Sequence, residues 1–221
     1  MTGKEVQKAF NNFVDEKNAI HRYASYDYCF NYFHSYNDKK ELAAEDNIEK
    51  SCLHLGFYLA SWGMFRGSSI LLQKSLQFYK PIIKWIAEDC PASVWKIDVN
   101  NYNEDYIKEL LFTYGKLAKF FEGHNELIIV TKIMLGVFGN TPAFDEYFTK
   151  TFRNNYGEIS KFRSFNNKSL FAIITFYNDH KIMIEEFRNN SYTYNYQTEK
   201  FTTINYTRAK IIDMIGFGGQ V

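Results

Sequence analysis

Apolar side chains recur at intervals of three and four residues along most of this chain, and this periodicity restricts its possible folds more than any other feature. The stripes lie at Val6, Phe10 and Phe13, at Tyr26, Phe30 and Phe33, at Ile48, Cys52, Leu55, Leu59 and Trp62, at Ile107, Leu110, Tyr114, Leu117 and Phe121, and at Leu170, Ile174, Tyr177, Ile184 and Phe187. Such spacing places side chains on one face of an α-helix. We therefore expect a predominantly helical protein, with one long helix at the last stripe.

Glycine and proline divide this pattern into separate helices. Pro81 fits the first turn of a helix over "PIIKWIAEDC", and Pro91 follows its last residue. The final stripe, in "YTRAKIIDMI", is followed by Gly216, Gly218 and Gly219. Glycine is common just beyond helix ends, so we expect these three residues to stop the last helix.

Residues 191–206, "SYTYNYQTEKFTTINY", have a different pattern. Tyr192, Tyr194 and Tyr196 alternate as on one face of a β-strand, and Gln197–Lys200 could turn the chain back. A small β-hairpin and a polar, aromatic loop both fit this segment. Without an internal repeat or a linker-like stretch, the sequence predicts one globular all-α domain over residues 1–221, of about eight or nine helices with at most this one hairpin.

The composition and charge of the chain bear on its binding partners and on its location in the cell. The 221 residues suffice for one sizeable core, and 26 basic residues against 25 acidic ones give a net charge of +1. That balance lacks the basic excess of non-specific nucleic-acid binders, although it allows a local basic patch. Cys29, Cys52 and Cys90 lack metal-ligand or disulfide spacing, and no apolar run is long enough for a membrane span. We expect a soluble, cytoplasmic protein that does not bind membranes.

An arginine in the most apolar window of the chain is the first candidate for chemistry. Arg66 lies between Gly63 and Gly67, and we expect a new helix to follow with Ser68 or Ser69 as its N-cap. Free N–H groups at a helix start, hydroxyls and a guanidinium together can bind an anion.

A structural role for Arg66 is the alternative. The window carries small residues four, three and four apart, which on a continuous helix would let a neighbouring helix approach closely: Gly56, Ala60, Gly63 and Gly67. Arg66 would then be at least half buried and paired with helix-end carbonyls or with a carboxylate, for which Asp145 is the first candidate.

The stretch "TKIMLGVFGNTPAFDEYF", residues 131–148, is the second candidate. It predicts a helix, a glycine turn at 136–142 and a second helix that opens at Pro142, with Asp145 in its first turn. Asp145 could serve as a general acid or base, or it could lie there because a helix start favours a carboxylate. Lys132 could join Asp145 and Arg66 in an enzyme pocket, or pack its stem and keep its charge in solvent.

Two resemblances arise from these motifs. "YLASWGMFRGSS" and "PAFDEYF" resemble a family of bacterial all-helical proteins, which implies a helical fold and no particular activity. The glycine turn followed by Pro-x-x-Asp is similar to the region of helix–hairpin–helix DNA glycosylases in which a catalytic aspartate begins a helix. That likeness implies that Asp145 matches the aspartate. The glycines here are three apart rather than two, and no hairpin lysine nucleophile is present.

Several chemistries have no support in the sequence. The five histidines lack metal-ligand spacing, and no phosphate-binding glycine loop or nucleophile elbow occurs. We therefore predict no metal and no cofactor. The sequence leaves three functions open. The first is a helical binding module that contacts nucleic acid through the 136–142 turn and Arg66, and the second is an enzyme that uses Arg66, Lys132 and Asp145. The third is a protein that acts through a partner, which an exposed apolar patch would support.

Overall fold

The amphipathic stripes fold into ten α-helices in the part of the chain that the structure, a computed structural model, describes: residues 1–67 and 69–220. The helices are α1 (Gly3–Asp15), α2 (Ala24–His34), α3 (Glu45–Ser61), α4 (Lys80–Lys84), α5 (Glu104–Ala118), α6 (Leu127–Phe138), α7 (Glu146–Tyr156), α8 (Asn167–Asp179), α9 (Lys181–Asn189) and α10 (Arg208–Gly218). The strands β1 (Tyr192–Tyr194) and β2 (Phe201–Asn205) pair in an antiparallel hairpin. The predicted all-helical fold with one small hairpin is confirmed.

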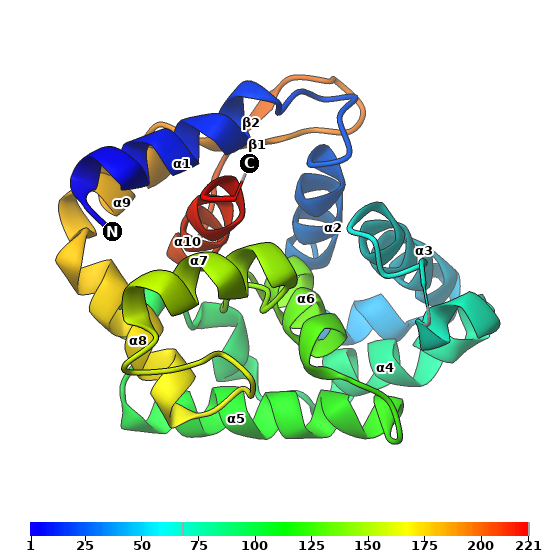
Figure 1. Ribbon diagram of the computed structural model, residues 1–221. Coiled ribbons are helices and arrows are strands. Elements are labelled where there is room, and N and C mark those ends of the chain that lie inside the picture. The colour runs from blue at the N-terminus through cyan, green and yellow to red at the C-terminus, as the bar shows by residue number, and fades with distance from the viewer. Residues whose placement is uncertain (68, 221) are drawn as a thin grey trace.

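Helix α10 is the centre of this arrangement. Every residue from Ala209 to Gly218 is buried, and α1, α7 and α9 pack around the helix (Figure 1). A helix that is apolar on all sides is stable only when neighbours cover all of it. The C-terminal segment is therefore the core around which the other helices assemble.

The predicted end of α10 at its glycines is confirmed, with Gly219 as the C-cap, but Gly216 and Gly218 also have a packing role that the sequence did not predict. α10 continues through Gly216 to Gly218. A Cβ on Gly216 would lie 2.4 Å from the Phe148 ring, and one on Gly218 would lie 2.0 Å from the carbonyl oxygen of Ala9. Glycine is needed at these positions because the neighbouring helices approach too closely for a side chain.

Several helix boundaries differ from the sequence prediction. The helix predicted over residues 81–90 is α-helical only to Lys84 and continues as a π-helix over Trp85–Asp89. The expected long C-terminal helix is divided at His180 into α8 and α9. The helix expected directly after Ser69 does not form as an α-helix. Two 3₁₀ turns occupy this segment instead, at Ile70–Gln73 and Leu76–Tyr79. Helix α7 begins at Glu146, so Asp145 is its N-cap rather than a residue of its first turn.

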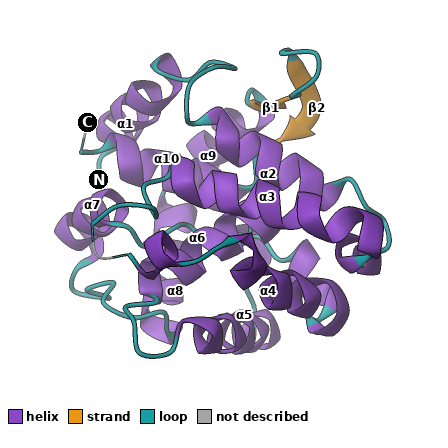
Figure 2. Cartoon of the chain, turned by 90° about the vertical axis from the view of Figure 1, so that its right-hand side faces the viewer, coloured by secondary structure: helices purple, strands orange, loops and turns teal. Residues whose placement is uncertain are grey.

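The hairpin is fastened to α2 by polar contacts from one strand. The backbone N–H of Tyr194 donates to Asp27 (2.8 Å), and the Asn31 amide donates to the Tyr194 carbonyl (2.9 Å). The Thr193 hydroxyl donates to the Asn31 side-chain oxygen (3.0 Å). Thr193 faces inward and is fully buried, so its alternating tyrosine neighbours lie on the outward side. Figure 2 shows the hairpin beside α2 and α3 at the top of the molecule.

Two further features concern the cysteines and the hydropathy of the helices. The structure leaves Cys29, Cys52 and Cys90 as free thiols. Among the described residues, no helix combines the length and the hydropathy needed to cross a bilayer.

The close approach of α10 to α1 predicts a contrast between two glycine substitutions. Gly218→Ala should lower the free energy of unfolding by about 1–3 kcal/mol, because its methyl group collides with backbone that cannot move aside. Gly115→Ala, in α5, is the control: its Cβ meets no atom within 4 Å, so the substitution should be neutral or stabilising by up to about 1 kcal/mol. Urea unfolding measures both; equal effects would contradict the proposed packing role of Gly218.

Candidate functional site

The structure brings two of the predicted site residues together inside the protein. Lys132 projects from α6, and its Nζ lies 3.0 Å from Oδ2 of Asp145, the N-cap of α7. The side chains are 4% and 15% exposed. The second Asp145 oxygen, Oδ1, accepts the backbone N–H of Phe148 (3.0 Å), which is the N-cap bond of α7. Lys132 thus neutralises a carboxylate that the helix start already requires.

A second buried ion pair lies close to the first on helix α10. Lys210 Nζ is 2.8 Å from Asp213 Oδ2, and Oδ1 of Asp213 accepts the backbone N–H of Ala143 (3.0 Å). The indole ring of Trp62 links the two pairs: the Nζ atoms of Lys132 and Lys210 lie 5.3 and 4.7 Å from its centroid. The prediction from sequence omitted Lys210 and Asp213, whose signal is an i, i+3 pair of opposite charges inside an otherwise apolar helix.

These interior charges have the contacts of a structural network. Each carboxylate has an ammonium group and a backbone N–H as partners, and each ammonium group also faces an aromatic ring, an arrangement that offsets the cost of burying charge. The main clefts of the described residues lie elsewhere, and neither Lys132 nor Asp145 lines one of them. The contacts of the pair therefore support a structural role.

Arg66 does not belong to this network, so the predicted pair with Asp145 is wrong. The arginine is exposed, and among the described residues it has no ion-pair partner. Helix α3 ends at Ser61, and Gly63 turns the chain with a φ of +79°, so the row of small residues does not continue on one helix. The guanidinium folds back over Gly63, where an added Cβ would lie 3.0 Å from Nε. The sequence could not reveal this early helix end.

Of the two serines predicted to form an anion site with Arg66, the structure describes only Ser69. Ser69 is engaged within its own turn: its hydroxyl donates to the Met64 carbonyl (2.5 Å) and accepts the N–H of Leu71 (3.3 Å). The helix that it caps is only the 3₁₀ turn Ile70–Gln73. Ser68 lies outside the described residues.

The glycine turn of residues 136–142 is buried throughout. Gly139 ends α6 in the left-handed conformation (φ +67°), and its N–H donates to helix carbonyls. Gly136 lies inside the helix, where an added Cβ would be 2.3 Å from the Tyr58 ring. Tyr102 donates its hydroxyl to the Asn140 carbonyl. A turn covered in this way does not offer its N–H groups to a phosphate at the surface.

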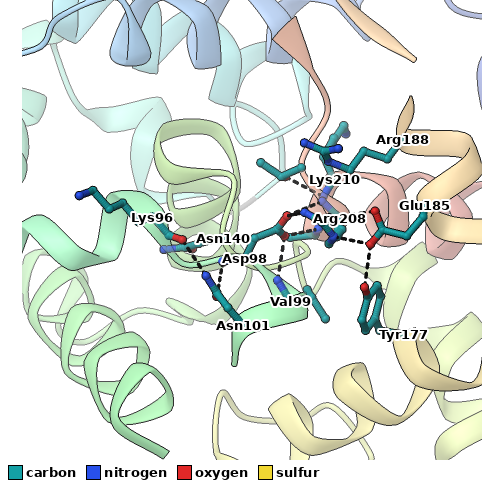
Figure 3. Close-up of polar contacts among 12 residues, drawn as sticks. Lys96, Asp98, Val99, Asn101, Asn140, Tyr177, Glu185, Arg188, Arg208 and Lys210 are labelled. Carbon is teal, nitrogen blue, oxygen red and sulfur yellow. Dashed lines mark hydrogen bonds and ion pairs between the residues drawn. The ribbon is translucent and has the colours of Figure 1, made fainter. Parts of the chain in front are cut away.

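Another polar network fastens the start of α10 (Figure 3). Arg208 donates two hydrogen bonds to Glu185, from Nε (2.6 Å) and Nη2 (2.8 Å), while its Nη1 reaches Asp98 (3.3 Å). Asp98 also accepts the backbone N–H groups of Arg208 and Ala209, which are free at the helix start. Tyr177 donates its hydroxyl to Glu185 (2.7 Å). These bonds join α8, α9 and α10. The Arg208 guanidinium lies between the carboxylates of Glu185 and Asp98.

The largest opening among the described residues is a groove between α2, α3 and the turn of the hairpin, with a volume of about 660 Å³. We call it the aromatic groove, because five of its lining residues carry rings: Tyr28, Tyr32, His54, Phe57 and Tyr196. The rings of Tyr32 and His54 are stacked 4.0 Å apart, and Tyr196 meets Tyr28 edge to face. Phe57 is 64% exposed and Tyr196 is 75% exposed, so both present bare aromatic surface.

The aromatic groove is uncharged but can form hydrogen bonds. None of its lining residues is Asp, Glu, Lys or Arg, and burial lowers the pKa of His54, so its imidazole is neutral at pH 7. A neutral imidazole offers one donor and one acceptor, and neither has a partner among the described residues. The amides of Asn195 and Gln197 complete the polar part of the rim. Sequence reasoning missed this site because residues 25–57 meet residues 195–197 only through the fold.

Comparison with known proteins adds no assignment: no family model, no curated protein and no solved structure matches the chain. No group of three or more His, Cys, Asp or Glu side chains in the described ranges is arranged to hold a metal ion.

The interior pair predicts a measurable coupling between Lys132 and Asp145. Lys132→Met should lower the free energy of unfolding by about 3–5 kcal/mol, because it leaves a largely buried carboxylate without its cation. Asp145→Asn keeps an N-cap oxygen and removes the charge. In a double-mutant cycle the two changes should be non-additive by at least about 1 kcal/mol.

Arg66→Ala serves as the matched control for a charge on the surface. It should alter the free energy of unfolding by no more than about 0.5 kcal/mol. Denaturant titrations of the four proteins of the cycle and of Arg66→Ala give all these values. Additive losses at Lys132 and Asp145 would show that the pair does not stabilise the fold.

Proposed function

We propose that the protein is a binding module whose aromatic groove takes an uncharged small molecule with a flat ring and hydrogen-bonding groups at its edge. The observation that supports this most directly is the exposure of Phe57 and Tyr196 on either side of a recess that also holds a stacked Tyr32–His54 pair. Large aromatic side chains normally bury most of their surface. Two exposed rings at one recess are a surface suited to stacking on a ligand.

The size of the aromatic groove supports a small-molecule ligand. Its volume of about 660 Å³ falls within the 300–1,000 Å³ that is usual for small-molecule sites. Such sites are mostly apolar and aromatic, with a few polar groups that fix the orientation of the ligand. Here the neutral His54 ring and the amides of Asn195 and Gln197 would serve that purpose.

The charge of the aromatic groove supports an uncharged ligand. A phosphate or carboxylate group placed there would lose water and gain no cation, because no Lys or Arg lines the groove. The same argument separates this proposal from nucleic-acid binding, which depends on contacts to the phosphate backbone. The buried 136–142 turn gives no support to nucleic-acid contact, and neither Lys132 nor Asp145 lines one of the main clefts of the described residues.

The proposed setting is the cytoplasm. Three free thiols, of which Cys29 and Cys52 are buried, suit a reducing compartment.

A library of uncharged compounds with flat rings, including nucleosides and free nucleobases, tests the proposal by ligand-observed NMR. We expect hits with a Kd below about 1 mM, and each hit should bind at least about tenfold more weakly to Phe57→Ser and Tyr196→Ser. Both side chains are exposed, so these variants should keep the melting temperature of the parent protein. Phosphorylated analogues of the same hits should bind no better than the neutral compounds.

Phe171→Ser is the matched control, because Phe171 is 58% exposed on a different face, between α5 and α8. It should leave the affinity of every hit unchanged. Hits that bind equally to all three variants, or that gain affinity from a phosphate group, would contradict the proposal.

A further inference from the structure

A lysine with its own carboxylate partner lies at the bottom of a second, smaller pocket on the other side of the hairpin. Lys17 follows α1, and its Nζ is 2.7 Å from Oδ2 of Asp27. The Lys17 side chain is 7% exposed and that of Asp27 is fully buried. This arrangement is independent of the aromatic groove and of the function proposed for it.

The surroundings of the pair are aromatic. Lys17 Nζ lies 4.6 Å from the centroid of the Tyr194 ring and 4.5 Å from that of Tyr206. The Tyr206 hydroxyl donates to the Asp27 carboxylate (2.8 Å to Oδ2), and the backbone N–H of Tyr194 does the same (2.8 Å). Lys210 is the nearest further cation that acts on this pair. Asp27 is therefore held in one orientation, with its charge directed at Lys17.

The pocket reaches Lys17 from solvent between α1 and the hairpin. Its walls include Val14, Ser191, Tyr192 and Phe201, and its volume is about 120 Å³. This pocket is much smaller than the aromatic groove, so it suits a ligand of only a few non-hydrogen atoms. Val14 and Tyr192 are each more than a third exposed, which places the entrance at the surface.

Burial lowers the cost of proton transfer from the Lys17 ammonium group to the Asp27 carboxylate. Burial raises the pKa of the Asp27 carboxyl to about 6, although Lys17 opposes this rise. Burial also lowers the pKa of the Lys17 ammonium group, against the attraction of Asp27. Both shifts bring the neutral amine and the neutral acid closer in free energy to the ion pair than they are in water. A desolvated lysine beside a proton acceptor is the arrangement that activates amine nucleophiles.

The geometry points to Lys17 as an amine nucleophile that forms an imine with a small aldehyde or ketone in this pocket, with Asp27 as its proton partner. Lys17 first passes a proton to Asp27, and the free amine then attacks the carbonyl carbon. The new C–N bond forms as the C=O π electrons move to oxygen, which takes a proton from nitrogen. Asp27 next protonates the hydroxyl group, and this group leaves as water while the nitrogen lone pair completes the C=N bond. The protonated imine ends paired with the Asp27 carboxylate.

Reductive trapping of the folded, full-length protein tests this inference. Propionaldehyde, which matches the pocket in size, is added at pH 7 with cyanoborohydride, and modified lysines are quantified by peptide mass spectrometry. We expect Lys17 to be alkylated at least about tenfold faster than Lys4, which is exposed in α1. Slower modification of Lys17 than of Lys4 would overturn the proposal, because burial would then protect the amine rather than activate it.

Two variants distinguish activation from mere accessibility. Asp27→Asn should lower the Lys17 rate at least about tenfold by removing the proton acceptor, provided that its circular dichroism shows a folded protein. Val14→Phe leaves the Lys17–Asp27 pair intact and narrows the pocket entrance; it should slow modification of Lys17 and leave the Lys4 rate unchanged. An unchanged Lys17 rate in Val14→Phe would show that the aldehyde does not enter through this pocket, and the proposal would fail even if Asp27→Asn cannot fold.

Discussion

Helix α10 is buried on every side although it carries Lys210 and Asp213, and the rest of the fold accommodates this requirement. The two charges neutralise each other, and Asp213 also accepts the N–H of Ala143 from the segment before α7. Asp98 accepts two free N–H groups at the helix start, and the Arg208 side chain there pairs with Glu185. Its glycines let α1 and α7 approach closely enough to exclude water. Burial of this one helix thus fixes the positions of its neighbours.

The polar side chains of this fold form two groups, one in the interior and one at the surface. In the interior, the Lys132–Asp145 and Lys210–Asp213 pairs each bring opposite charges together, and both ammonium groups also face the Trp62 ring, so these groups stabilise the fold. At the surface, the hairpin extends over α2 and is held there by Asp27 and Asn31. Its turn creates the aromatic groove on one side and its strands enclose Lys17 on the other. The hairpin therefore contributes to both candidate sites, and α2 positions it.

Sequence reasoning succeeded where a local pattern determines structure and failed where a residue serves two purposes. The apolar stripes predict helices because their spacing matches the helix repeat, whereas the alternating tyrosines are compatible with a hairpin or a loop, and the structure shows the hairpin. Glycine marks both a helix end and a close contact, so the sequence located the end of α10 but did not reveal that Gly216 and Gly218 admit α7 and α1. Arg66 and Asp145 are charged residues in glycine-marked windows, but the end of α3 at Ser61 directs the arginine outward. The aromatic groove and the Lys17 pocket combine distant segments, which no local pattern reveals.

The central claim is that the interior charges stabilise the fold and the aromatic groove binds the ligand. The most direct test is to locate a bound ligand on the isotope-labelled protein from changes in the backbone amide chemical shifts. A hit from the uncharged ring library is titrated to saturation. The account predicts that the largest shifts cluster in α2, in residues 53–57 of α3 and in residues 195–197, while the amides near Lys132, Asp145 and Asp213 stay unchanged. Shifts centred on those interior residues would contradict the account, because they would show that the buried charges, and not the aromatic groove, receive the ligand.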